Sequence, residues 1–157
     1  MNLLLRSPNW LGDAVIGLPA VQALQHKLPP GSRFSVLTPG KLADFWKIVP
    51  GIDHVLTVDP NLWITADSLR PFHFDTALIF PNSLRTAAEP WLARIPRRIG
   101  FKGHQRRWLL TDVVPKYNRA QGLRHQSLDY LDLVSTLLKA SNPISNQQSA
   151  ISPPCPP

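Results

Sequence analysis

The sequence predicts an α/β fold, a Rossmann-like domain with an open, mostly parallel sheet and helices on both faces. Short apolar runs recur along the chain, and most gaps between them have the length of a short crossover helix. The runs are continuously apolar rather than alternating, which is typical of strands that are covered on both faces. The 157 residues, 43% of them hydrophobic, suffice for one such domain with its own core.

Five apolar runs are the expected strands. After the first interval, their starts lie roughly 20 residues apart. They occupy residues 3–5, 34–37, 55–58, 76–80 and 98–101.

Four further stretches are the expected helices, and three of them lie between these runs. Residues 14–28 place apolar side chains on one stripe at helical spacing, and Pro19 is expected to kink or restart this helix. The remaining helices are expected at residues 41–49, 83–94 and 125–139.

The composition changes at Ala140. From there to Pro157 the chain has no charged residue but five prolines and four serines, so it lacks the apolar side chains for a core. We therefore expect a folded domain over residues 1–139 and a disordered tail or linker over residues 140–157. The single cysteine, Cys155, excludes an internal disulfide, and no Cys/His cluster indicates a metal site.

The sequence shows no targeting signal. The apolar run at residues 3–5 is too short for a signal peptide, because polar residues and Gly12 soon follow it. No 18 consecutive residues are apolar, so no membrane-spanning helix is expected. The predicted location is the cytoplasm, for a soluble or peripherally attached protein.

Positive charge is concentrated in one segment. Residues 85–124 contain ten Lys or Arg and two acidic residues, and so account for the formal charge of +7 of the whole chain. This segment is either an ordinary solvated surface or a surface that binds anions. Nucleic acid is a less favoured partner, because the segment has few aromatic residues and no nucleic-acid-binding motif.

Three loops are the candidate binding loops, because ligands of open parallel sheets bind at the carboxyl ends of the strands. These loops are residues 7–13, 81–85 and 102–107. The first contains neither G-x-G-x-x-G nor a P-loop motif, so the domain is not expected to hold a nucleotide.

Asp13 is the strongest catalytic candidate. It is expected at the start of a helix, where backbone N–H groups and the helix dipole favour an ionised carboxylate, and Gly12 allows a ligand to approach the backbone closely. Two roles are open from the residues alone: Asp13 is a general base, or it only caps the helix.

The first loop has a recognisable sequence. Arg-Ser-Pro-Asn-Trp-Leu-Gly-Asp at residues 6–13, followed by Leu-Pro-Ala at 18–20, closely resembles the start of the lipopolysaccharide heptosyltransferases of glycosyltransferase family 9, most specifically heptosyltransferase II. Weaker matches follow in the same order, at residues 50–53, 74–75, 80–85, 91–96, 98–101 and 109–112.

The resemblance implies the N-terminal, acceptor-binding domain of a two-domain GT-B glycosyltransferase. Such an enzyme transfers heptose from ADP-L-glycero-β-D-manno-heptose to the lipopolysaccharide inner core, of the Kdo-lipid A type, with inversion and with no metal or other cofactor. The resemblance also implies that Asp13 is the general base, and that the protein contacts the inner membrane peripherally. The acceptor's carboxylates and phosphates suit the basic segment.

Ten further residues are candidate acceptor contacts, because they occupy the matched motifs, the binding loops, the basic segment or the start of the last helix. They are Asn9, Trp10, Gly12, Asn82, Ser83, Arg85, Arg98, Arg106, Arg107 and His125.

Some of these candidates have simpler alternative roles. Trp10 either stacks on a sugar or packs under the first helix. Ser83 either binds the acceptor or caps the following helix. His125 either contacts the acceptor or is a capping or surface histidine.

Family members are about twice as long as this chain, so the C-terminal donor domain is expected to be missing and the chain alone to be inactive. The alternative is a non-catalytic acceptor-binding module, and a basic nucleic-acid-binding domain is the remaining possibility.

Overall fold

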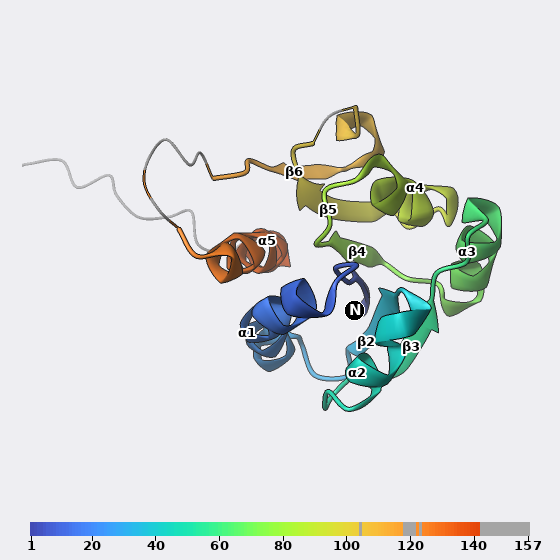
Figure 1. The fold of residues 1–157 in the computed structure, drawn as a ribbon, viewed down its shortest axis with the longest axis horizontal. Coiled ribbons are helices and arrows are strands. Elements are labelled where there is room, and N and C mark those ends of the chain that lie inside the picture. Colours follow the sequence, from blue (N-terminus) through green and yellow to red (C-terminus); the bar gives the residue numbers. More distant parts are fainter. Residues whose placement is uncertain (104, 118–121, 123, 142–157) are drawn as a thin grey trace, which may run out of the picture.

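Parallel strands form a single open sheet (Figure 1). The computed structural model describes residues 1–103, 105–117, 122 and 124–141. In this part of the chain every strand pairs in parallel, in the order β3-β2-β1-β4-β5-β6. The strands are β1 (Asn2–Arg6), β2 (Arg33–Thr38), β3 (His54–Thr57), β4 (Thr76–Ile79), β5 (Arg97–Phe101) and β6 (Asp112–Val114). The predicted α/β fold with an open sheet is confirmed.

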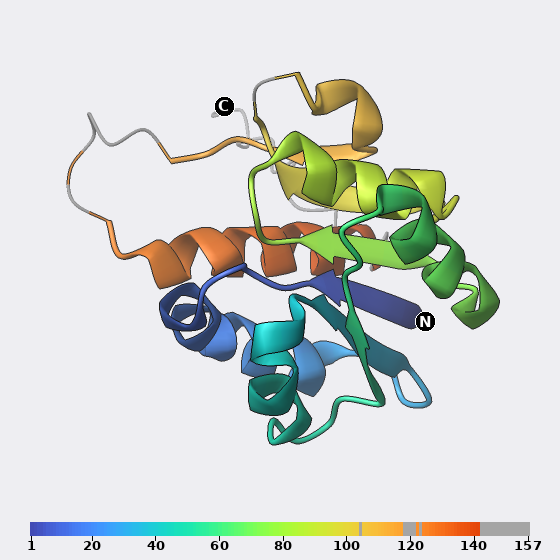
Figure 2. The same cartoon turned by 45° about the vertical axis from the view of Figure 1, so that its right-hand side comes forward.

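Helices cover both faces of the sheet (Figures 1 and 2). One face carries α1 (Leu11–Lys27), α2 (Ala43–Lys47) and α5 (Gln126–Ser141), and the other carries α3 (Leu62–Leu69) and α4 (Leu84–Leu92). In β1, Leu3 and Leu5 pack into the core on the side of α1, α2 and α5, and Leu4 packs into the core on the side of α3. All three side chains are fully buried. Burial on both faces explains why the sequence of β1 is continuously apolar. Among the described helices, none is both long and apolar enough to cross a membrane.

Among the described strands and α-helices, β6 and α3 were not predicted. The strand β6 is only three residues long and carries Asp112. The helix α3 contains several polar residues, which conceal its apolar stripe, but Asn61 marks its start, since its side chain accepts a hydrogen bond from the Trp63 N–H at 3.0 Å. Short polar segments of this kind give a weak periodic signal in the sequence.

The first and last predicted helices have different limits in the structure. Helix α1 begins three residues earlier than expected, at Leu11, and continues through Pro19. Pro19 is exposed, as is Val15, whose carbonyl lacks its helical partner, so water can replace the missing N–H. Helix α5 extends past Lys139 to Ser141, and the rest of the predicted tail, residues 142–157, lies outside the described residues.

The strand order reverses direction between β1 and β4. The last pair in their register joins Arg6 to Ile79, so Ser7 and Phe80 leave the sheet side by side at its carboxyl edge. In open parallel sheets this reversal leaves a crevice in which ligands bind. The fold thus brings the first two predicted binding loops together.

Candidate functional site

A cavity of about 320 Å³ lies at the carboxyl ends of β1 and β4. It is formed by the loop after each of these strands, the start of α1, the segment after β6 and the first turns of α5. Its lining residues are Pro8, Asn9, Trp10, Asp13, Phe80, Pro81, Asn82, Phe101, Lys116, Tyr117, Arg124, Gln126, Asp129 and Tyr130.

Two stacked aromatic rings form part of the cavity wall near α1 and α5. The rings of Phe80 and Tyr130 stack with centroids 4.4 Å apart and an interplanar angle of 15°. Gly17 of α1 faces this pair, and a Cβ there would lie 3.1 Å from the Phe80 ring. A larger residue at position 17 would therefore crowd the Phe80 ring, and glycine lets α1 lie close to this aromatic pair.

Asp13 is a half-buried carboxylate in the first turn of α1, where it lines the cavity. The N-cap of this helix is Trp10, so the alternative that Asp13 is the capping residue is wrong. Because the helix starts at Leu11, Asp13 occupies the third helical position, at the positive end of the helix dipole. This position allows the carboxylate to face the cavity.

A polar network from α5 reaches Asp13. The side-chain amide of Gln126 donates to Asp13 Oδ1 at 3.4 Å and contacts the Tyr130 hydroxyl at 3.1 Å. Burial is the largest cause of a raised pKa at Tyr130, and the charges of Asp13 and Asp129 add to it. Tyr130 is therefore a neutral hydroxyl at physiological pH.

Asn9 and Trp10 are exposed at the mouth of the cavity. Trp10 is 67% exposed, so the alternative that it packs under the first helix is wrong. Instead, Lys41 Nζ lies 3.8 Å from the centre of its ring, a cation–π contact. Gly12 is exposed and outside the lining, and a Cβ there would meet no atom within 4 Å.

The cations of the basic segment, residues 85–124, do not all lie at the cavity. Lys116 and Arg124 line the cavity, whereas the predicted contacts Arg98, Arg106 and Arg107 do not. The positive charge of Arg124 is offset by two carboxylates, because its Nη1 lies 2.9 Å from Asp132 Oδ2 and 3.8 Å from Asp129 Oδ1.

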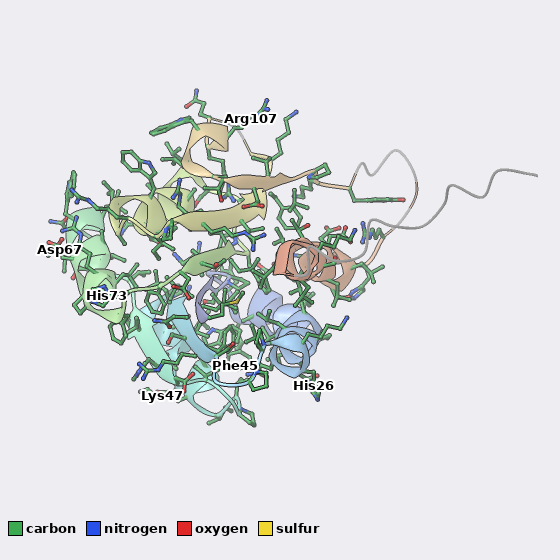
Figure 3. All side chains as sticks on the ribbon, turned by 180° about the vertical axis from the view of Figure 1, so that it is seen from behind. His26, Phe45, Lys47, Asp67, His73 and Arg107 are labelled. Carbon is green, nitrogen blue, oxygen red and sulfur yellow. The ribbon has the colours of Figure 1, made fainter. Side chains whose placement is uncertain are left out.

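The three predicted arginines have other environments. Arg98 bonds to the backbone carbonyls of Ile95 and Leu109, near the starts of the strands and hence at the opposite edge of the sheet. Arg106 is fully buried. Arg107 is exposed and projects from the outer edge of the molecule near β6 (Figure 3).

The loop after β4 carries three predicted contacts, Asn82, Ser83 and Arg85. Of these three, Asn82 lines the cavity and the other two do not. The Ser83 hydroxyl accepts from the Thr86 N–H at 3.3 Å, so the helix-capping alternative is confirmed for Ser83. Arg85 turns away and donates to the carbonyl of Pro60 at 2.9 Å.

His125 lies just before α5 and outside the lining, with Nδ1 2.7 Å from the Ser127 hydroxyl. The residues after it were not predicted as part of the site. Gln126, Asp129 and Tyr130 have helical spacing and share one face of α5. That spacing is the only signal in the sequence that groups them, and it does not indicate that this face meets α1.

Comparison with known proteins gives a consistent set of relatives. No protein-family model matches the sequence. Lipooligosaccharide heptosyltransferase 2 of Haemophilus ducreyi is 30% identical over 121 residues, which cover 72% of this chain and 34% of that protein. The structure of E. coli ADP-heptose lipopolysaccharide heptosyltransferase II is 26% identical, with a TM-score of 0.75 over 85% of this chain and 40% of that one.

A further structural neighbour supports the fold. The E. coli heptosyltransferase WaaC with ADP has a TM-score of 0.72 and 18% identity, over 93% of this chain and 50% of that one. The chain spans about a third of the length of the curated relatives that it matches. The resemblance indicated by the sequence is confirmed: this chain is related in sequence and fold to part of the lipopolysaccharide and lipooligosaccharide heptosyltransferases.

Proposed function

We propose that this chain is the acceptor-binding part of a heptosyltransferase in which Asp13 is the general base. The donor is ADP-L-glycero-β-D-manno-heptose, and the acceptor is a hydroxyl of the lipopolysaccharide inner core on lipid A. The observation that carries the proposal is the position of Asp13, a half-buried carboxylate in the cavity where the strand order reverses.

The proposed reaction is a single inverting displacement. The acceptor hydroxyl oxygen attacks the anomeric carbon from the face opposite ADP, and the bond from that carbon to the diphosphate breaks as ADP leaves with the electron pair. Asp13 takes the hydroxyl proton as the new bond forms, because a neutral sugar hydroxyl is a poor nucleophile. The Gln126 amide, which donates to Oδ1, holds the carboxylate in place and leaves Oδ2 for the proton.

The donor is assigned to the remainder of the enzyme. The β1–α1 loop has no glycine-rich motif, and the bulky Trp10 stands at the N-cap where a dinucleotide fold places a phosphate. We expect this chain alone to bind acceptor and to form no product. Since lipid A anchors the acceptor in the membrane, the proposed place of action is the cytoplasmic face of the inner membrane.

Lys116 is the proposed contact for the acceptor's anionic groups. It is exposed and lines the cavity, and it has no ion-pair partner among the residues that the structure describes. Arg124, the other cation of the lining, is already paired with acidic residues of α5. The carboxylates or phosphates of an acceptor would therefore pair with the ammonium group of Lys116.

Replacing Lys116 by Gln is expected to weaken acceptor binding by about tenfold or more, since a hydrogen bond to a charged group contributes about 1.5–3 kcal/mol and Lys116 is at the lower end of this range because it is exposed. The Kd is measured by calorimetric titration of the chain with the water-soluble Kdo disaccharide of the inner core. Arg107→Gln is the matched control, because it removes one positive charge from an exposed side chain outside the cavity.

Equal weakening by both variants would show a general charge effect and would contradict a specific role for Lys116. No binding by the unmodified chain would overturn the acceptor-binding proposal itself. Acceptor binding without product, after the chain is joined to the donor-binding part of a relative, would favour a non-catalytic binding module.

A further inference from the structure

Arg106 is a fully buried arginine beside the loop that carries Asn82. Its Nη1 donates to the Pro81 carbonyl at 2.7 Å and to the Ser83 carbonyl at 3.0 Å. These two carbonyls stand on either side of Asn82, which lines the cavity. One guanidinium nitrogen therefore fixes the backbone both before and after a residue of the candidate site.

Two glycines make room for this arginine. A Cβ on Gly100 of β5 would lie 2.5 Å from Arg106 Nη2. A Cβ on Gly103 would lie 2.8 Å from Arg106 Cδ and 2.6 Å from Asn82 Oδ1. Gly103 is thus in contact with both side chains, so Asn82 and Arg106 are packed as one unit against the segment that follows β5.

Packing alone does not favour an arginine at this position. Among the described residues, no carboxylate pairs with it, and its Nε and Nη2 have no hydrogen-bond partner. Burial lowers the pKa of Arg106 to about 10, so the group is still a cation at neutral pH. An apolar side chain of similar volume would avoid the desolvation of that charge. What it would not supply is the pair of hydrogen bonds that holds the loop.

We propose that Arg106 is a positioning residue, which fixes residues 81–83 so that the Asn82 amide faces the cavity, and that it does not touch the acceptor. Its complete burial excludes the direct contact expected from the sequence. The inference rests on the proposed function only for what Asn82 then does, which is to hydrogen-bond the bound acceptor.

The test uses four single variants of the 157-residue chain and one double variant, which combines Arg106→Met with Asn82→Ala. Arg106→Met removes the two hydrogen bonds and keeps most of the volume, Arg106→Lys keeps a donor, and Asn82→Ala removes the positioned group. Arg107→Met is the matched control, because it makes the same change at the adjacent exposed arginine. Thermal unfolding identifies the variants that remain folded.

The first readout needs no acceptor. In nuclear magnetic resonance spectra of the free protein, we expect Arg106→Met to shift the Asn82 side-chain amide signals toward random-coil values. Arg106→Lys is expected to restore them in part, and Arg107→Met to leave them unchanged. If Arg106→Met fails to fold, Arg106→Lys still tests the proposal, because one ammonium group cannot reproduce the guanidinium geometry and the signals must shift. Unchanged Asn82 signals in a folded Arg106 variant would overturn the proposal.

The second readout is the Kd for the soluble Kdo disaccharide. Arg106→Met and Asn82→Ala are each expected to weaken binding by about tenfold, and the double variant by no more than either one alone, because both act through one group. Additive losses in the double variant would overturn the positioning role. If the unmodified chain does not bind the disaccharide, the proposed function fails, and the Asn82 signals still decide the role of Arg106.

Discussion

Asp13→Asn is expected to lower kcat by about 100-fold or more in a complete heptosyltransferase that carries this chain, because Asn keeps the shape of the side chain but cannot accept the acceptor's proton. Initial rates with ADP-heptose and a Kdo-containing acceptor measure the effect. The fold is expected to persist, since Asp13 is half-buried and is not the N-cap of α1. Acceptor affinity should change far less than the rate.

Asp44→Asn is the matched control for this variant. Asp44 is also an acidic residue in the first turn of a helix, α2, but it is exposed and pairs with Lys47 outside the cavity. Both variants therefore remove a negative charge from the first turn of a helix, but only Asp13→Asn removes it from the cavity. A near-normal rate for a folded Asp13→Asn enzyme would reduce Asp13 to a contributor to helix stability.

The second large effect is expected on stability, at the buried pair of Arg6 and Glu89. Arg6 at the end of β1 is 3% exposed, Glu89 of α4 is fully buried, and Arg6 Nε lies 2.5 Å from Glu89 Oε2. Glu89→Gln leaves the buried guanidinium without a counter-charge, so the free energy of unfolding should fall by about 3–5 kcal/mol. Urea unfolding of the chain, followed by circular dichroism, measures this change.

Asp67→Asn provides the comparison for an exposed pair. Asp67 bonds to Arg70 on the periphery of the molecule (Figure 3), and its loss is expected to change stability by less than about 1 kcal/mol. Replacing Arg6 and Glu89 together by Met and Leu should recover much of the loss, because no uncompensated buried charge remains and Arg85, which also contacts Glu89, is partly exposed to water. A loss below 1 kcal/mol for Glu89→Gln would mean that water reaches and stabilises Arg6.

The buried pair also bears on the cavity. Arg6 Nη1 donates to the Ser7 carbonyl at 2.8 Å, and Ser7 directly precedes the lining residues Pro8 and Asn9. Together, Arg6 below the first loop and Arg106 below the second hold the two loops from within the protein. Both arginines thus serve the site through backbone carbonyls rather than by contact with a ligand.

The sequence by itself determined the elements whose signal is local. Each predicted strand lies at its expected place, because strands buried on both faces need continuous apolar runs, as in residues 3–5 and 76–80. The loop after β1 could be identified as a candidate binding loop because it follows a strand at the carboxyl edge and carries a contiguous motif, residues 6–13. The capping role of Ser83 was likewise open to prediction, since a cap depends on neighbours within three residues.

Only the tertiary structure decided which distant side chains share the cavity. Gln126 reaches Asp13 across 113 positions of the sequence, because α5 packs against α1 on one face of the sheet. The clustering of basic residues in the sequence also did not determine their roles, for Lys116 lines the cavity while Arg106 is buried and Arg98 lies near the opposite edge. The physical reason is that charge and composition are summed along the chain, whereas burial and hydrogen-bond partners are set by which helix faces and strand ends the fold brings together.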